Sequence, residues 1–167
     1  MTTTETKPFI ISRIFNAPRT TMWRLWTDVR HLQNWFGPKG VTTSYAKLDL
    51  RPGGIFHYMM TWPNGTEIWG RMIFQEIQPP EKLVWINSFS DAECGITRHP
   101  LTTDPWPLEL HTEVTFEEQN GQTMVTVRWE PVNATENEID FFNISHSSME
   151  QGWGGTFENL KTYLTTL

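Results

Sequence analysis

The chain has 167 residues, which is the length of one domain with a hydrophobic core. Its 13 basic and 19 acidic side chains give a formal net charge of −6 without a basic cluster, so nucleic acid is not an expected partner. The one cysteine, Cys94, cannot form an internal disulfide, which is typical of a reducing compartment. No signal peptide is visible and no apolar run approaches the ~20 residues that span a bilayer. We therefore expect a cytoplasmic protein with no membrane span.

Residues 1–41 predict one strand followed by two short helices. Residues 1–7 are polar and are expected to be disordered, whereas apolar side chains at strand spacing predict a strand over residues 8–15. An apolar stripe at helical spacing predicts a helix that begins near Arg19. The stripe consists of Met22, Trp23, Trp26 and Val29. A second helix, near residues 30–35, is expected to end at Gly37-Pro38.

The middle of the chain predicts six further strands separated by turn signals. We expect these strands at residues 42–50, 54–62, 66–77, 82–90, 108–118 and 122–130. Asn64-Gly65 and Asn120-Gly121 suit the positive φ angles of tight hairpin turns. Residues 91–107 contain three prolines and show no usable period, so they are expected to form a long loop.

The last segment, residues 136–167, predicts a long amphipathic helix. Its apolar face is formed by residues that recur at steps of three and four. These are Ile139, Phe142, His146, Met149, Trp153, Phe157, Leu160 and Leu164. Gly152, Gly154 and Gly155 surround Trp153, and each interior glycine costs a helix about 1 kcal/mol relative to alanine. Glycines here indicate that another segment approaches the helix backbone closely or that the helix bends.

The order of these elements predicts an α+β fold of the helix-grip type. Consecutive hairpins give an antiparallel sheet, and the terminal helix must cover its apolar face. We expect one domain over residues 1–167, with a curved sheet of six or seven strands wrapped around the C-terminal helix. Two short helices follow the first strand.

Aromatic side chains on one face of several strands and of the terminal helix predict an apolar cavity between sheet and helix. A filled core is the alternative, because such stripes are mainly packing. The candidate ligand-binding residues are Phe56, Tyr58, Met60, Trp85, Asn87, Phe89, Trp129, Phe142, His146, Met149 and Trp153. Among these, Tyr58, Asn87 and His146 are polar groups that could orient a ligand or, equally, satisfy nearby backbone groups.

Signals for metal, cofactor or catalysis are poor. Cys94, His99 and His111 lack the spacing of a zinc site. The serines near His146 do not form a G-x-S-x-G elbow, and no neighbouring carboxylate orients that histidine as a general acid or base. Gly53-Gly54 precedes a strand, so it predicts a turn or bulge rather than a phosphate-binding loop. We therefore expect no metal, no cofactor and no catalytic residue.

Several motifs occur together in one known family. Its opening is matched by Phe15-Asn16-Ala17-Pro18, by Met22 through Asp28 and by Trp35-Phe36-Gly37-Pro38. Later matches are Asp49 through Phe56, Gly70 through Pro80 with Leu83-Val84, and Met149-Glu150-Gln151-Gly152-Trp153 with Leu160 and Leu164. On these motifs the chain resembles the homologue family of the heat-shock-protein-90 ATPase activator, within the START / birch-pollen-allergen-like (SRPBCC) superfamily.

The resemblance implies a cavity between the sheet and the C-terminal helix that takes an apolar small molecule. Residues 91–107 depart from the family pattern because they are longer and richer in proline than its compact connection. They could form a rim, a lid or an oligomer contact.

Three functions follow as hypotheses. The preferred one is a binding module for a hydrophobic molecule, lipid-like or aromatic, without catalysis. The second is a protein-interaction module acting on a chaperone, which is disfavoured because the chain lacks the additional N-terminal domain of the eukaryotic activators. The third is an enzyme of the cyclase or hydrolase type, which no carboxylate pair or nucleophile supports. A homodimer stays open as a further partner arrangement.

Overall fold

The computed structural model describes residues 4–167, so the expected disorder of residues 1–3 lies outside the described part. The helices are α1 (Arg19–Thr27), α2 (Val29–Trp35), α3 (Glu136–Ile144) and α4 (His146–Leu164). The strands are β1 (Phe9–Phe15), β2 (Thr42–Leu48), β3 (Ile55–Thr61), β4 (Glu67–Gln78), β5 (Lys82–Ser90), β6 (Ile96–Thr97), β7 (Glu109–Gln119) and β8 (Gln122–Val132).

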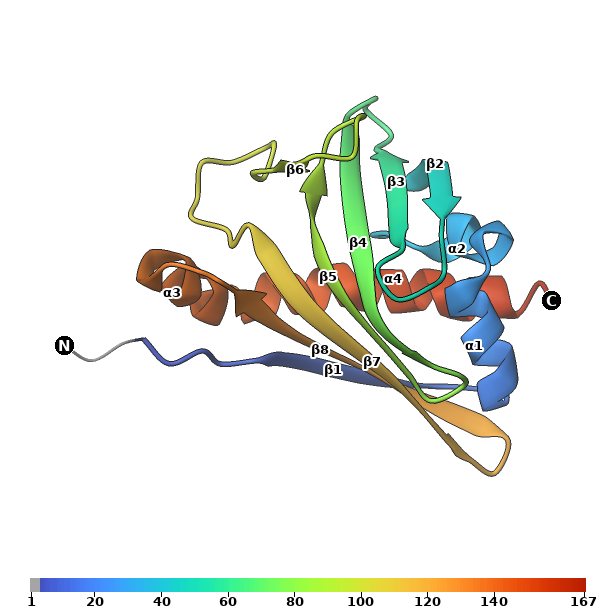
Figure 1. The fold of residues 1–167 in the computed structure, drawn as a ribbon. Helices are drawn as coiled ribbons and strands as arrows, with labels where there is room; N and C mark the ends of the chain where they lie inside the picture. The colour runs from blue at the N-terminus through green and yellow to red at the C-terminus, as the bar shows by residue number, and fades with distance from the viewer. Residues whose placement is uncertain (1–3) are drawn as a thin grey trace.

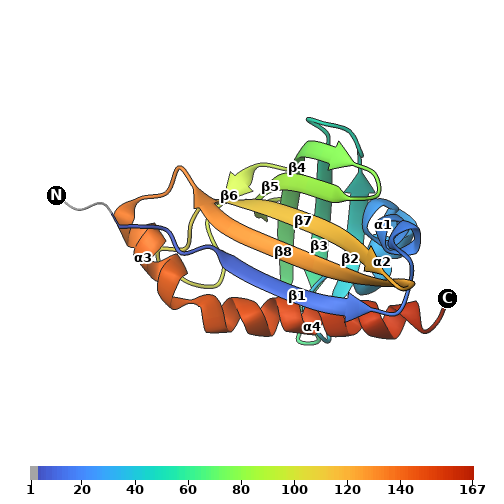
Figure 2. The same ribbon diagram turned by 90° about the horizontal axis from the view of Figure 1, so that it is seen from below.

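The strands form one antiparallel sheet in the order β1-β8-β7-β5-β4-β3-β2, with the two-residue strand β6 paired to β5. Figures 1 and 2 show the sheet curving around α4, which lies along its concave side. Hairpins join most neighbours, and the segment containing α1 and α2 carries the chain from β1 at one edge to β2 at the other. The predicted helix-grip fold is confirmed.

The C-terminal helix is present but divided, so the expectation of one continuous helix from residue 136 is wrong. Thr135 and Glu138 form a capping box that begins α3, and Ser145 separates α3 from α4. The Ser145 hydroxyl donates to the Phe141 carbonyl at 2.6 Å, a local hydrogen bond of the kind that often bends a helix. Figure 2 shows α3 running at an angle to α4.

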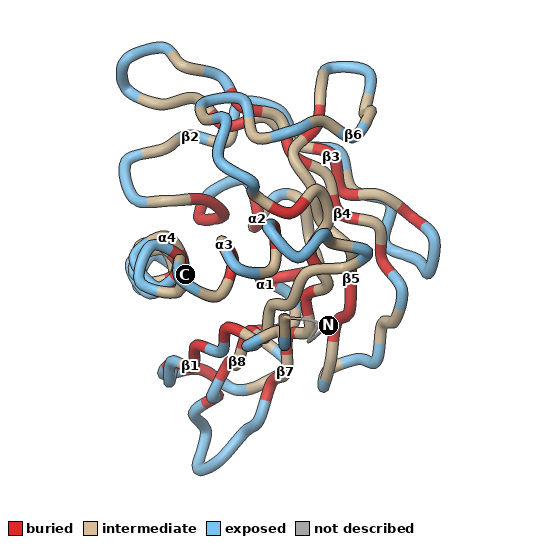
Figure 3. The backbone as a smooth tube through the Cα atoms, turned by 90° about the vertical axis from the view of Figure 1, so that its left-hand side faces the viewer, coloured by how far each residue is buried: buried red, intermediate tan, exposed pale blue. Residues whose placement is uncertain are grey.

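The core fills the end of the fold where α1 and α2 pack against the sheet. The Trp26 ring lies 4.8 Å from Trp35, 5.8 Å from Phe116 and 6.3 Å from Trp153 between ring centroids. The Trp35 indole N–H donates to the Leu25 carbonyl at 3.0 Å, so this buried polar group is satisfied. Figure 3 shows buried residues recurring along the strands, and the exposed residues of α4 lie on its side away from the sheet.

One of the helix glycines is explained by a close approach of backbone. A Cβ atom on Gly155 would lie 3.2 Å from the backbone nitrogen of Lys39, because the segment after α2 crosses α4 there. The Asn159 amide donates to the Gly37 carbonyl at 2.9 Å and ties the same two segments together. Gly152, by contrast, has open space beside it. Within residues 4–167 no helix is both long and apolar enough to cross a membrane.

Candidate functional site

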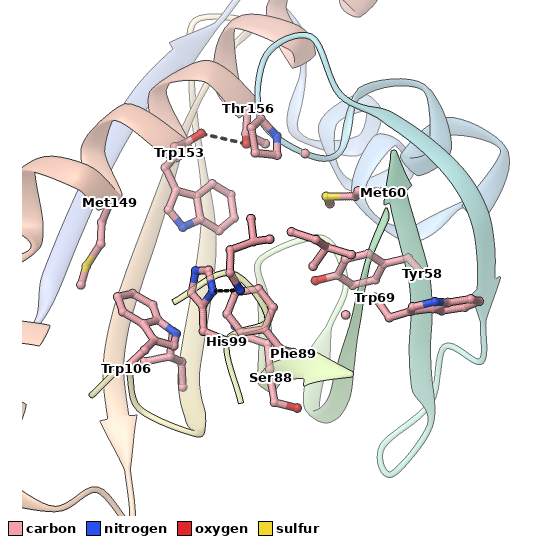
Figure 4. Close-up of a pocket in the computed structure, with 18 of the residues that line it drawn as sticks. Tyr58, Met60, Trp69, Ser88, Phe89, His99, Trp106, Met149, Trp153 and Thr156 are labelled. Atoms are coloured by element: carbon pink, nitrogen blue, oxygen red, sulfur yellow. Dashed lines mark hydrogen bonds between the residues drawn. The ribbon is translucent and has the colours of Figure 1, made fainter. Parts of the chain in front are cut away.

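A cavity of about 440 Å³ lies between the first half of α4 and the inner face of the sheet. Its walls come from β3, β4, β5, β7 and β8, the segment after α2 and the loop that precedes β7. Figure 4 shows Met149, Trp153 and Thr156 of α4 on one side, with Tyr58 and Met60 of β3 facing them. The cavity therefore occupies the end of the fold opposite the packed α1 cluster.

Strand register explains how one wall is built. Tyr58 pairs with Gly70 on β4, and Gly70 pairs with Phe89 on β5, so these three residues form one row across the sheet. The Tyr58 ring lies over Gly70, where a Cβ atom would come within 2.4 Å of the phenol carbon and oxygen. The absence of a side chain at Gly70 therefore allows the phenol to lie against the sheet.

The structure brings part of the predicted site together. Seven of the candidate residues border the cavity. They are Tyr58, Met60, Asn87, Phe89, Trp129, Met149 and Trp153. They come from β3, β5, β8 and α4, so the faces chosen from sequence alternation do converge on one space.

Two candidate residues lie behind the wall because distant segments cover them. Phe56 stacks on Tyr58 at 4.9 Å and meets Phe36 at 5.9 Å. Trp85 lies 6.4 Å from Trp26 of α1, which separates it from the cavity. Strand alternation predicts the face on which a side chain lies, but not which neighbour covers that face.

The remaining two candidates lie near the α3–α4 corner. Phe142 is fully buried against Trp106 and His146. The His146 Nε2–H donates to the Lys7 carbonyl at 2.9 Å, and its ring meets Phe9 edge-on at 5.7 Å. His146 therefore ties the segment before β1 to the start of α4 and does not border the cavity.

Several cavity residues were missing from the sequence prediction. Leu101 and Trp106 come from the loop over residues 91–107, and Phe36 follows α2. Apolar side chains within a proline-rich loop were the available signal, since such side chains usually need a surface to pack on. The loop therefore forms part of the cavity wall. Arg98 holds it to α3 through an ion pair with Glu138 at 2.5 Å.

Electrostatically, the lining is nearly neutral. None of the described lining residues is Asp, Glu, Lys or Arg. Burial lowers the pKa of His99, and the nearby Asp104 only partly opposes this, so the imidazole is neutral at pH 7. Its Nδ1 accepts a hydrogen bond from the Leu101 backbone N–H at 3.1 Å, which leaves the proton of the neutral ring on Nε2.

A few polar groups interrupt the apolar walls. Burial raises the pKa of the Tyr58 phenol, so its hydroxyl stays protonated at neutral pH. Asn87 accepts a hydrogen bond on Oδ1 from the Thr112 hydroxyl at 2.6 Å. The Trp129 indole N–H is buried and has no acceptor among residues 4–167. Such isolated polar groups on apolar walls orient small ligands in proteins.

Metal-binding geometry is not found in the described part of the chain. Residues 4–167 contain no group of three His, Cys, Asp or Glu side chains placed to hold a metal ion. Cys94 lies on the loop after β5 and has a free thiol. Its backbone carbonyl accepts a hydrogen bond from the Arg71 guanidinium at 2.6 Å. The arrangement is suited to enclosing an apolar molecule.

A curved antiparallel sheet closed over a C-terminal helix, with an apolar cavity between them, defines a helix-grip domain of the SRPBCC superfamily. Residues 16–165 match the model of the family described as activator of Hsp90 ATPase homolog 1-like protein, and the chain belongs to this family. No curated protein matches the chain.

Solved structures from several bacteria share the fold. A protein from Arthrobacter aurescens is 25% identical with a TM-score of 0.76, and the match covers 96% of this chain and 87% of that one. A Mycobacterium smegmatis protein is 24% identical with a TM-score of 0.75, over 99% of both chains. The AHSA1 protein from Silicibacter pomeroyi is 17% identical with a TM-score of 0.70, over 96% of this chain and 99% of that one.

Proposed function

We propose that the protein binds an apolar small molecule in the cavity between α4 and the sheet. The observation that carries the proposal is a space of about 440 Å³ in a fold whose other end is filled with tryptophan and phenylalanine rings. Cavities of about 300–1,000 Å³ with mostly apolar walls are typical of small-molecule sites.

In this proposal Tyr58 and Asn87 orient the ligand, while Trp129, Met149 and Trp153 supply apolar contact. Burial of apolar area contributes about 25 cal/mol per Å², so an aromatic ligand can gain affinity without any ion pair. His146 has no part in it, because its Nε2–H is used by the Lys7 carbonyl. Phe56 and Phe142 act from behind the wall by packing against the lining residues Tyr58 and Trp106. Trp85 packs in the core against Trp26 and Phe74.

The unpaired thiol of Cys94 supports a cytoplasmic location, which we propose for the protein.

Two glycines of α4 allow a matched test. Gly152 borders the cavity and has no atom within 4 Å of an added Cβ, so Gly152→Phe should place a ring in the binding space. Gly154 lies two residues on, outside the lining, where an added Cβ meets only an Arg13 side-chain nitrogen at 4.0 Å. Gly154→Phe therefore makes the same substitution in the same helix without filling the cavity.

Binding can be followed with the uncharged dye N-phenyl-1-naphthylamine, whose fluorescence rises in an apolar site. We expect wild type and Gly154→Phe to bind the dye with similar affinity, and Gly152→Phe to bind at least 10-fold more weakly. Native mass spectrometry of the purified protein should also show a retained small molecule as added mass. Equal dye binding by both variants, or no binding by the wild type, would contradict the proposal.

A further inference from the structure

The described cavity wall carries no formal charge, and this limits the kind of ligand it can hold. Its lining contains neither carboxylates nor Lys or Arg, and its one imidazole, His99, is neutral. A charged ligand that entered would lose its hydration without gaining a counter-ion, which is strongly unfavourable. The wall therefore favours uncharged molecules and disfavours carboxylates.

Two lining side chains, Asn87 and Tyr58, carry a hydrogen-bond donor that no partner among residues 4–167 uses. The Oδ1 of Asn87 is already occupied by the hydroxyl of the fully buried Thr112, so its amide N–H₂ is the unused group. The Trp129 indole N–H also lacks an acceptor among residues 4–167, but neighbouring atoms shield it from the cavity. Asn87 borders the cavity. An acceptor atom on a ligand can therefore form a hydrogen bond with the Asn87 amide.

The hydroxyl of Tyr58 lies close to the same part of the wall. Its oxygen would be 2.4 Å from a Cβ atom on Gly70, so it sits above β4 and not above its own strand. Gly70 pairs with Phe89, and Asn87 is the diagonal neighbour two residues along β5. Diagonal neighbours in a sheet lie about 7–8 Å apart, so one ligand can meet both groups. The structure shows no hydrogen bond from the Tyr58 hydroxyl to residues 4–167, and Figure 4 shows it pointing into the cavity.

From this combination we propose that the cavity is selective for uncharged aromatic molecules bearing a hydrogen-bond acceptor oxygen, such as an aryl ketone, and excludes carboxylates, including fatty acids. The Tyr58 hydroxyl and the Asn87 amide donate to that oxygen, while Phe89 and Trp153 contact the rings. This proposal rests on the proposed binding function and adds the chemical class of the ligand.

A cation is the competing occupant that the aromatic walls suggest. Trp, Tyr and Phe rings attract quaternary ammonium groups. Here, however, the described lining contains no carboxylate that could balance a cation, and the Asn87 N–H₂ group presents the positive end of its dipole. The test therefore includes a cationic probe.

Four probes of similar shape separate these possibilities: 2-acetylnaphthalene, 2-isopropylnaphthalene, 2-naphthoate and trimethyl(2-naphthyl)ammonium. Each is titrated by displacement of N-phenyl-1-naphthylamine at pH 7.5. We expect the ketone to bind about 10-fold more tightly than the hydrocarbon, because a ligand hydrogen bond contributes about that factor. The carboxylate and the ammonium ion should bind at least 10-fold more weakly than the ketone.

One variant and its control then assign the donor. Tyr58→Phe keeps the ring over Gly70 but removes the hydroxyl, so the ketone should lose about 5–10-fold in affinity while the hydrocarbon is unchanged. Tyr45→Phe removes a hydroxyl from a tyrosine that lies outside the cavity lining, so it should change the affinity of neither the ketone nor the hydrocarbon.

Each outcome distinguishes the two proposals. If the ketone and the hydrocarbon bind with equal affinity and Tyr58→Phe has no effect, the proposed selectivity is wrong, whereas the proposed binding function stands. Tightest binding by the carboxylate or by the ammonium ion would also overturn the selectivity. If neither the dye nor the hydrocarbon binds, the binding function fails as well. The wild-type probe series needs no variant, so a variant that fails to fold does not prevent a decision.

Discussion

Replacing Gly70 with alanine should push the Tyr58 ring out of its place. The added Cβ would lie 2.4 Å from the phenol carbon and oxygen, about 1 Å closer than ordinary contact allows. Phe56 stacks on this ring at 4.9 Å and Phe36 closes another side at 5.3 Å. The displaced ring can therefore move only toward the cavity.

The magnitude follows from two opposing terms. Overpacking a well-packed site costs about 1–3 kcal/mol, and replacing glycine by alanine within a strand recovers about 0.5–1 kcal/mol. We expect Gly70→Ala to lower the free energy of unfolding by about 1–2 kcal/mol, measured by urea unfolding. It should also weaken binding of N-phenyl-1-naphthylamine, because the ring then occupies part of the binding space.

A double-mutant cycle tests the cause directly. In a Tyr58→Leu background the shorter side chain no longer lies over residue 70, so Gly70→Ala should cost at least 1 kcal/mol less than in the wild type. Gly152→Ala serves as a glycine control, since it has open space and should stabilise α4 by up to about 1 kcal/mol. Additive effects of Gly70→Ala and Tyr58→Leu would refute the steric explanation.

Three further predictions concern stability. Burial lowers the pKa of His99 below 6.5 in the folded protein. The stability that the neutral ring contributes is therefore fully present above pH 6.5 and is lost as the pH falls through the folded-state pKa. His99→Asn should therefore show a shallower loss of unfolding free energy between pH 7 and 5, and an unchanged slope would contradict this. Trp26→Ala should lower the free energy of unfolding by about 3–5 kcal/mol, measured in urea. Trp153→Ala should lower it by less, because that ring borders the cavity. Equal losses would show that the cavity is filled. Burial opposes ionisation of Glu138, but hydrogen bonds from the Thr135 backbone and from Arg98 outweigh it and hold its pKa below 4.5. Glu138→Gln can keep the capping box, and it should lower the free energy of unfolding by about 0.5–1 kcal/mol at pH 7. The difference from wild type should narrow below pH 4.5, and a difference that does not change with pH would refute this reasoning.

Sequence periodicity was sufficient for the fold because each signal depends on near neighbours in the chain. The alternation of β5 placed Trp85, Asn87 and Phe89 on one face, and the strand register agrees with that face. Asn64-Gly65 and Asn120-Gly121 lie at the β3–β4 and β7–β8 turns. Gly65, Asn120 and Gly121 have the expected positive φ angles, whereas Asn64 does not.

Periodicity failed where helix continuity was assumed. His146 is the first residue of α4 and keeps its helical spacing to Met149 and Trp153, but the break at Ser145 turns the chain there, beside the segment before β1. The residue then meets Lys7 and Phe9, which lie more than 130 positions away in the sequence. Local pattern contains no information on that contact.

The amino-acid sequence by itself determined the order of the main strands and helices, the antiparallel sheet and which side chains of a strand share a face. Tertiary structure alone decided which of those side chains meet empty space. Trp85 and Asn87 are two residues apart on the same face, yet Trp26 covers one while the other borders the cavity. The reason is physical: alternation follows from backbone geometry, whereas a cavity exists only where side chains from distant segments fail to fill the space between them.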